Sequence, residues 1–260
     1  MPKYYKNSDE ILRSVKRRVV VPESQNLFTD QDLLDFATEE IDSHIVPLIN
    51  IQQENYFLTF ETVEIVPGQT RYTIPYRATG NKLKDLAFIP SNETPRVKEM
   101  SEIDVGDLPA FDRSYSNSEP YIYYVSSNEI CLVPETNNFT GFLRFGFYLR
   151  TNALVPMEEV GTITNVDTNA GIVTVSSIPE KFTVDDLYDF VMEKSPHKIL
   201  SYDNPVTSVN TGTGQITFGP GNLPTGLAKG DLVCLAGETG IPNIPSDLHN
   251  MCCHRAGARV

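Results

Sequence analysis

An internal repeat between residues 160 and 240 constrains the fold of this chain more than any other feature. The segment ITNVDTNAGIVTV (163–175) aligns with VTSVNTGTGQITF (206–218), and PEKFTVDDLYDF (179–190) aligns with PTGLAKGDLVCL (224–235). Each copy has the pattern of a hairpin with a glycine-containing turn, a proline-led loop, an acidic residue and a further strand. The duplication predicts a small β-barrel or β-sandwich inserted at 160–240 into a larger fold.

The glycine-rich turns of the repeat, TGTG (211–214) and GPGNLPTG (219–226), have an alternative interpretation as phosphate-binding loops. A phosphate loop needs a following Lys-Ser or Lys-Thr pair and a strand-to-helix context, and neither turn has them. We therefore interpret both segments as hairpin turns.

Two amphipathic helices are predicted in the first fifty residues. NSDEILRSVKRR (7–18) begins with Asn7 and Glu10 in a capping-box arrangement and ends before Pro22. TDQDLLDFATEEIDSHIV (29–46) begins with Thr29 and Asp32 in the same arrangement, and we expect it to end at Pro47. Apolar residues recur at helical spacing in the second helix, so that one face must be covered by another element. These residues are Leu34, Ala37, Ile41 and Ile45.

The periodicity changes to two after Tyr56, which predicts an antiparallel β middle region. YFLTFETVEIV (56–66), the turn PGQ and TRYTIP (70–75) read as strand, turn and strand. The segment 101–120 reads as a long polar connection. In TGFLRFGFYLR, Leu143, Phe145, Phe147 and Leu149 alternate with Arg144, Gly146, Tyr148 and Arg150, which predicts one buried and one wet, cationic face.

Aromatic residues in this region admit two interpretations. Tyr121, Tyr123, Phe145 and Phe147 would form either the core of a sheet or a platform on which nucleic-acid bases stack. The surrounding charge is not basic enough to hold a phosphate backbone, so sheet core is favoured.

The charge of the 260-residue chain is −13, which disfavours general binding to duplex DNA. Cations nevertheless crowd the first eighteen residues, and Arg13, Lys16 and Arg17 share one face of the predicted helix. This face is either a partner-binding surface, for an acidic protein or nucleic acid, or an ordinary solvated helix surface. We take Arg13, Lys16 and Arg17 as the candidate partner-binding residues.

The N-terminal sequence lacks the apolar stretch of a signal peptide, and no segment has the roughly 18 consecutive apolar residues of a membrane span. Four cysteines, two of them adjacent, do not form the framework of a disulfide-stapled domain. We expect a soluble protein that is made in the cytosol, makes no contact with a membrane and keeps its thiols reduced.

The C-terminal stretch SDLHNMCCHRAGARV (246–260) is expected to be a helix with Ser246 at its start. Its two histidines and two cysteines suggest zinc, because His249, Cys252 and Cys253 share a face. Structural zinc sites usually draw ligands from two elements, however, and adjacent cysteines on a helix diverge by about 100°. We expect buried thiols on an apolar stripe and no metal site.

No motif of an enzyme or cofactor site is recognisable. The chain contains no HExxH, no Gly-x-Ser-x-Gly, no Walker loop and no dinucleotide fingerprint. We expect a protein that is not an enzyme and needs no cofactor.

Four segments give the chain a likeness to a known family: PGQTRYTIP (67–75), EPYIYYVSSNEICLVPE (119–135), LRFGFYLRTNALV (143–155) and IPSDLHNMCCHRAGARV (244–260). With the predicted helices, they make roughly two thirds of the chain resemble the head-to-tail connector (adaptor) proteins of short-tailed bacteriophages, the tail tubular protein A type. The matching motifs are patterns of aliphatic, aromatic and turn residues. The duplicated block at 160–240 is additional to the family pattern.

The resemblance implies a virion protein of the phage neck, assembled in the cytoplasm of the bacterial host. It would form a ring, usually a dodecamer, that joins the portal protein to a tail nozzle or tail tube protein and extends the DNA channel. The packaged DNA would pass through without specific binding, and an acidic wall suits that passage because it repels phosphates.

The resemblance also implies an α+β fold in which N- and C-terminal helices form a bundle around an antiparallel β middle. We therefore expect an adaptor-like domain at 1–159 and 241–260, and an inserted β domain at 160–240. Two other functions remain open from the sequence: a β-rich receptor- or carbohydrate-binding virion module, and a metal-dependent enzyme supported only by the C-terminal stretch.

Overall fold

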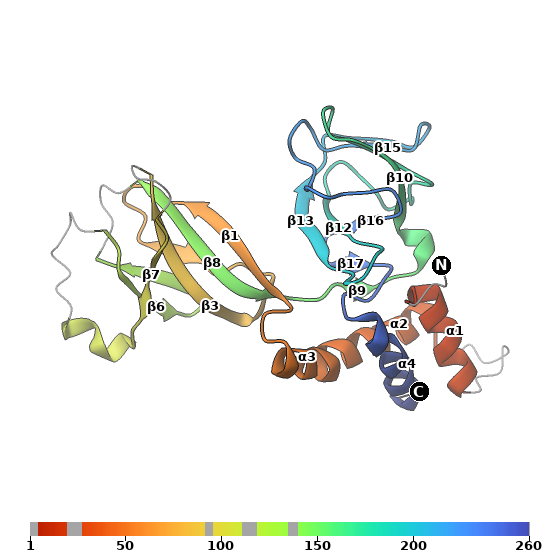
Figure 1. Cartoon of the computed structure of the whole chain (residues 1–260), viewed down its shortest axis with the longest axis horizontal. Helices are drawn as coiled ribbons and strands as arrows, with labels where there is room; N and C mark the ends of the chain where they lie inside the picture. The colour runs from red at the N-terminus through yellow and green to blue at the C-terminus, as the bar shows by residue number, and fades with distance from the viewer. Residues whose placement is uncertain (1–4, 20–27, 92–95, 111–118, 135–139, 260) are drawn as a thin grey trace. The chain divides into compact units, whose positions relative to one another are not determined.

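The structure, a computed structural model, describes residues 5–19, 28–91, 96–110, 119–134 and 140–259 (Figure 1). The fold is mixed α+β, with few helices and mostly antiparallel sheets. The chain forms two compact units. Unit 1 contains Met1–Ile49 and Thr151–Val260, and unit 2 contains Asn50–Arg150.

This division differs from the expected domain boundaries, because residues 160–240 belong to the same unit as the helices. Hydrogen bonds tie the repeat to its surroundings: the Asn152 side chain donates to the buried carboxylate of Asp189 at 2.7 Å. A shared apolar cluster also crosses the expected boundary, and Val155 and Ile241 pack in it with Val191 from inside the repeat. The segment that forms a compact unit of its own is 50–150.

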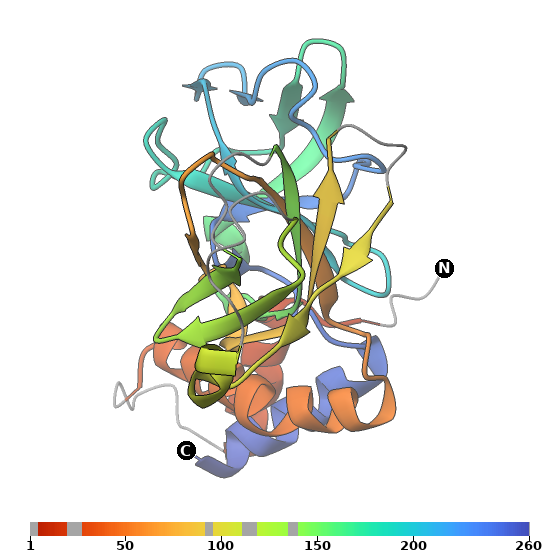
Figure 2. The ribbon, with the colours of Figure 1, turned by 90° about the vertical axis from the view of Figure 1, so that its left-hand side faces the viewer.

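Three helices of unit 1 contact one another: α1 (Ser8–Val19), α2 (Asp30–Glu40) and α4 (His249–Arg259). In Figure 1 they lie together below the strands of unit 1, and in Figure 2 they remain below the strands coloured teal to blue. Unit 1 also contains two short 3-10 helices. The helix η3 (Met157–Glu159) precedes the repeat, and the helix η4 (Ser246–Leu248) precedes α4.

The predicted starts of the two N-terminal helices are confirmed. At the start of α1, the backbone N–H of Asn7 donates to the Glu10 carboxylate at 3.1 Å, and the backbone N–H of Glu10 donates to the Asn7 side chain at 3.0 Å. Thr29 caps α2, and the Asp32 side chain accepts from the Thr29 backbone. These reciprocal bonds satisfy N–H groups that lack a partner within the helix.

The second helix does not end at Pro47, as the sequence had suggested. It continues through a π-helical turn, η1 (Ile41–Ile45), into α3 (Val46–Gln52). A proline inside an α-helix removes one hydrogen bond and its ring clashes with the carbonyl four residues earlier. The wider π turn directly before Pro47 changes that spacing, which explains why the helix passes the proline. The predicted apolar stripe of this helix is buried, at Leu34, Ala37, Ile41 and Ile45.

The repeat of unit 1 forms a seven-stranded antiparallel sheet in the order β13-β12-β16-β10-β11-β15-β14. Its strands are β10 (Gly161–Asp167), β11 (Ile172–Val175), β12 (Leu187–Val191), β13 (Ile199–Pro205), β14 (Ser208–Asn210), β15 (Gln215–Thr217) and β16 (Leu232–Leu235). A short parallel pair, β9 (Ala153–Leu154) with β17 (Glu238–Thr239), lies beside it in the chain.

The two copies pair with each other through equivalent residues. Val173 of β11 lies opposite Ile216 of β15, its counterpart in the second copy. Asp189 of β12 lies opposite Cys234 of β16, which is again its counterpart. Such self-matching pairs are the mark of a local two-fold relationship between the copies.

The two strands at the ends of this sheet are neighbours along the chain. The terminal strands of the sheet, β13 and β14, are successive parts of one stretch that is interrupted only at Val206 and Thr207. A single apolar cluster fills the interior, and its aromatic members contact one another edge to face or at a tilt. They are Phe182, Tyr188, Phe190 and Phe218.

Unit 2 contains two four-stranded sheets, in the orders β1-β8-β3-β4 and β2-β7-β6-β5. The first consists of β1 (Leu58–Glu64), β3 (Ala78–Pro90), β4 (Lys98–Glu99) and β8 (Gly141–Leu149). The second consists of β2 (Arg71–Thr73), β5 (Ser101–Glu102), β6 (Ile122–Ser126) and β7 (Glu129–Val133). The strands on either side of the PGQ turn, β1 and β2, thus belong to different sheets.

The predicted alternation in β8 is confirmed in part: the opposite face is not fully exposed, since Gly146 is buried and Arg144 and Tyr148 are half-buried, and Leu149 is only half-buried. Leu143, Phe145 and Phe147 are fully buried, and Tyr123 of β6 is 5% exposed. The aromatic residues at these positions are sheet core, whereas Tyr121 is exposed. Within 101–120, residues Val105–Ala110 form the 3-10 helix η2, and 111–118 lie outside the described residues.

None of the helices among the described residues is long and apolar enough to cross a bilayer.

Candidate functional site: a basic groove on helix α1

A groove of about 380 Å³ lies along α1. Its lining combines three cations, one carboxylate and two hydroxyl groups, contributed by Tyr5, Lys6, Glu10, Arg13, Ser14 and Arg17. Two of the three predicted partner-binding residues, Arg13 and Arg17, therefore line the same hollow. They stand four residues apart, so both side chains lie on one face of the helix.

Lys16 does not join them, because its Nζ pairs with Asp30 of α2 at 2.5 Å. Both side chains of this pair are about half exposed, so the pair contributes little to stability. It does direct Lys16 toward α2. Of the three predicted residues, the structure brings together two.

The cations of the groove differ in how much hydrogen-bonding capacity remains. Lys6 donates from Nζ to Ser14 Oγ at 2.9 Å, and Arg13 donates from Nε to the carbonyl oxygen of Asp9 at 3.3 Å. Within the described part of the chain, the two terminal nitrogens of the Arg13 guanidinium have no partner and can contact a ligand. Among the described residues, Arg17 has no hydrogen bond or ion pair.

The segment before α1 completes the wall of the groove. This segment is held in place by hydrogen bonds to other residues of unit 1. The Tyr5 hydroxyl donates to Glu193 Oε1 at 2.5 Å, and the backbone N–H of Lys6 donates to Nδ1 of His249 at 3.0 Å. The Tyr5 ring lies 4.9 Å from the ring of His197. Burial, together with the hydrogen bond and the charge of Glu193, raises the pKa of Tyr5, so it remains a neutral donor.

Two buried histidines support this segment. His249 donates from Nε2 to the carbonyl oxygen of Ile244 in the tautomer that leaves Nδ1 free to accept from Lys6. Burial, and to a smaller extent the neighbouring His197, lower the pKa of His249 to about 4. Burial also lowers the pKa of His197, whose ring centroid is 5.4 Å from that of His249. Both imidazoles are therefore neutral at pH 7.

The sulfur-containing residues of α4 point to separate neighbours. Cys252 lies 3.7 Å from the Ala37 carbonyl oxygen, and Cys253 lies 3.8 Å from Nζ of Lys6. His254 meets Arg18 at the surface. Both cysteines are fully buried, as expected from the apolar stripe. In the part of the chain that the structure describes, no group of three or more His, Cys, Asp or Glu side chains is arranged to hold a metal ion.

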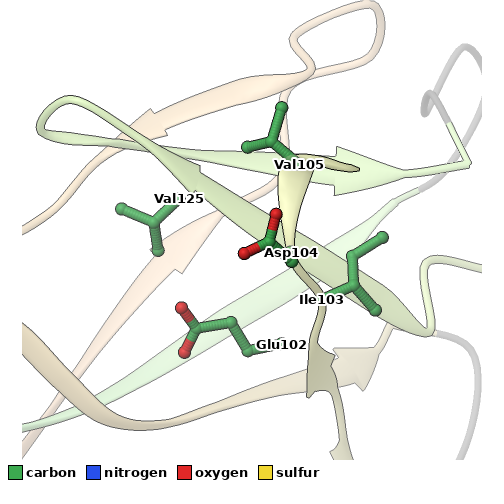
Figure 3. A pocket seen from close by; sticks show the side chains of 5 residues that line it. All are labelled: Glu102, Ile103, Asp104, Val105 and Val125. Carbon is green, nitrogen blue, oxygen red and sulfur yellow. The ribbon is translucent and has the colours of Figure 1, made fainter. Parts of the chain in front are cut away.

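A second hollow, of about 410 Å³, lies in unit 2. Figure 3 shows the carboxylates of Glu102 and Asp104 beside Val125, with Ile103 and Val105 completing the wall. Asp104 accepts from the N–H of Gly106 at 2.8 Å, which fixes the start of η2. Its acidic lining suits neither a phosphate nor a carboxylate ligand, and nothing beyond its two carboxylates points to a cation.

Sequence reasoning missed Tyr5, Lys6 and Ser14 as parts of the groove. Ser14 lies between the two arginines and was visible as a neighbour on the same helical face. Tyr5 and Lys6 precede the helix, and only their contacts with Glu193 and His249, far away in sequence, place them at the groove.

No protein-family model matches the chain, and no curated protein sequence matches it.

Proposed function

We propose that this protein is a structural component of a phage neck, a head-to-tail adaptor that forms a ring between the portal and the tail and extends the DNA channel. The proposal starts from the resemblance of four sequence segments to connector proteins of short-tailed phages. The single observation that carries it furthest is the arrangement of unit 1, where α1, α2 and α4 contact one another and Arg17 of α1 has no hydrogen bond or ion pair with the described residues.

The contacts between these helices support the terminal bundle that the family resemblance implies. Glu40 of α2 accepts from Nε of both Arg255 and Arg259 of α4 at 2.5 Å, and its side chain is 4% exposed. Such a clamp connects the N-terminal part of the chain to its C-terminal helix. The closed order of strands in the repeat supports a small β-barrel beside this bundle.

Charge supports the role of a conduit. A chain with a net charge of −13 repels DNA phosphates, which limits adhesion during passage. The portal, the tail protein and neighbouring copies are the partners we propose, because a ring requires contacts between different faces of the same protein. The localisation we propose is therefore the virion neck.

The alternative of a carbohydrate-binding module requires exposed aromatic residues on 160–240 for sugars to stack on. Four aromatic side chains of this block, Phe182, Tyr188, Phe190 and Phe218, are instead buried in its interior. Tyr202 is only partly exposed. We therefore propose the adaptor function alone.

The decisive experiment combines particle assembly with imaging. Particles assembled without this protein should package DNA but leak it, and added purified protein should restore both DNA retention and tail attachment. Negative-stain images and native mass spectra of the protein mixed with its portal should show rings. Infectious, DNA-retaining particles that form in its absence would refute the proposal.

A further inference from the structure

An exposed acidic turn precedes β12. Val184 and Leu187 are 48% and 41% exposed, which is high for apolar side chains, and Asp185 lies between them on the surface. The Asp186 carboxylate accepts from the Thr183 hydroxyl at 2.7 Å, so the turn has a fixed shape. Asp185 makes no hydrogen bond or ion pair with the described residues. The turn thus presents a carboxylate between two apolar side chains.

The turn and the basic groove lie toward opposite ends of β12. The strand begins at Leu187, directly after the turn, and ends at Val191. Glu193, two residues beyond the strand, accepts the hydrogen bond from Tyr5 of the groove. A strand of this length spans roughly 15 Å at about 3.3 Å per residue. The turn is therefore separated from the groove of its own copy, and both positions are fixed within unit 1.

The two surfaces are complementary. The groove carries Lys6, Arg13 and Arg17 against a single carboxylate, and the terminal nitrogens of Arg13 and Arg17 are the donors that remain available. A guanidinium binds a carboxylate through two parallel hydrogen bonds.

We infer that the α1 groove of one copy binds the Val184–Leu187 turn of a neighbouring copy, with Asp185 placed between Arg13 and Arg17. Because groove and turn are different surfaces, the contact is head-to-tail and repeats from copy to copy until a ring closes. The inference rests on the proposed function, since it names the contact by which the adaptor ring assembles.

A protein carboxylate suits the groove better than a nucleic-acid backbone. The groove is small, it contains Glu10, and the hydroxyl of Tyr5 is already committed to Glu193. A nucleic-acid backbone would extend beyond the three cations and bring further phosphates against a chain of strongly negative net charge. A single acidic turn places one carboxylate, which the two guanidiniums can match, in the groove.

Charge reversal on each side tests the contact. The groove variant is Arg13→Glu with Arg17→Glu, and the turn variant is Asp185→Lys. A matched control, Lys194→Glu with Lys229→Glu, removes two exposed cations of the same unit outside the groove. Circular dichroism and thermal unfolding establish that each variant is folded. Sedimentation velocity over a range of protein concentrations, with and without the portal, measures self-association.

We expect the control to assemble like the unchanged protein. The groove and turn variants should each lose affinity for another copy by about tenfold or more. An equimolar mixture of the two variants should assemble again, with the two variants alternating from copy to copy. The unchanged groove of the turn variant meets the unchanged turn of the groove variant, and the acidic groove of the groove variant meets the basic turn of the turn variant. Added salt should weaken both contacts.

The outcomes separate the two proposals. If the unchanged protein forms rings and both variants form them equally well, or if the mixture of the two variants fails to assemble again, the groove–turn contact is refuted while the ring stands. If the unchanged protein remains monomeric at every concentration and beside its portal, the adaptor function itself fails, and this inference fails with it. Binding of DNA that the groove variant abolishes would also overturn the inference.

Discussion

Val173 of β11 lies directly opposite Ile216 of β15, and the two residues occupy the same position in the two copies of the internal repeat. Both side chains are fully buried in one apolar cluster. The duplication thus builds a core in which each copy covers the other, because neither hairpin has enough apolar surface to be stable alone.

Shortening Ile216 should therefore destabilise the whole of unit 1. We expect Ile216→Ala to lower the free energy of unfolding by about 2–4 kcal/mol and Ile216→Val by about 1 kcal/mol, as measured by urea denaturation. Val173→Ala combined with Ile216→Ala should deviate from additivity by at least roughly 0.5 kcal/mol, because the residues are in contact. Val15→Ala on α1 combined with Ile216→Ala is the control and should be additive.

A substitution at Gly171 tests how tightly the turn between β10 and β11 is packed. Its φ of +67° is unfavourable for other residues, and a Cβ atom there would lie 1.9 Å from the Gly219 carbonyl oxygen, a backbone atom that cannot rotate away. We expect Gly171→Ala to cost more than about 3 kcal/mol, because strain and overlap add. Gly221→Ala is the matched control. Its φ is +80° and its Cβ would meet open space, so only strain of about 1–2 kcal/mol should appear in thermal unfolding. Equal losses for the two variants would contradict the steric account.

Glu40 connects α2 to α4. Burial alone would raise the pKa of this carboxyl, but the guanidiniums of Arg255 and Arg259 outweigh burial and hold it below its usual range. Glu40→Gln should lower the free energy of unfolding by about 1–3 kcal/mol, since it removes the buried charge that both arginines contact. Glu39→Gln, which removes an exposed partner of Arg259, should cost less than about 0.5 kcal/mol in the same urea titration.

His249 makes stability depend on pH. Its pKa falls to about 4 in the folded protein, so between the ordinary histidine value and pH 4 only the unfolded chain takes up the proton. Stability contributed by this residue is complete at neutral pH and is lost as the pH falls through that window, by roughly 1.4 kcal/mol per pH unit. Protonation would also place a second donor at Nδ1 against the N–H of Lys6.

The free energy of unfolding should therefore decrease less between pH 7 and pH 5 in His249→Gln than in the unchanged protein, as measured by urea titration at each pH. His254→Gln is the control, because that histidine lies at the surface of the same helix. The N-terminal segment should become accessible to protease at acidic pH before unit 2 does. An identical pH dependence in His249→Gln and in the control would refute this role.

Cys252 and Cys253 should react slowly with a thiol reagent. Both are fully buried, and burial raises the pKa of Cys252 to about 12, so little thiolate forms at pH 8. The expected result is a reaction limited by unfolding, with all four cysteines reacting at once in denaturant. Rapid reaction of the native protein, or stoichiometric zinc that Cys252→Ser removes, would show that this helix has another role.

Local features of this fold were determined by the sequence alone. The capping boxes at Asn7 and Thr29, the alternation of Leu143, Phe145 and Phe147, and the duplication between 160 and 240 depend on residues that are close in sequence or on a direct internal match. Each therefore leaves a pattern that can be read without coordinates. The assignment of Arg13 and Arg17 to one helical face was predictable for the same reason.

Tertiary structure alone decided the features that depend on long-range partners. The expected end of the helix at Pro47 was overridden by a π turn. Lys16 was drawn to Asp30, and Tyr5 and Lys6 were brought to the groove by Glu193 and His249. The boundary of unit 1 likewise follows from contacts such as Asn152 with Asp189. Periodicity reports which face of an element is apolar, but the identity of the residue that meets that face is set only when distant segments pack together.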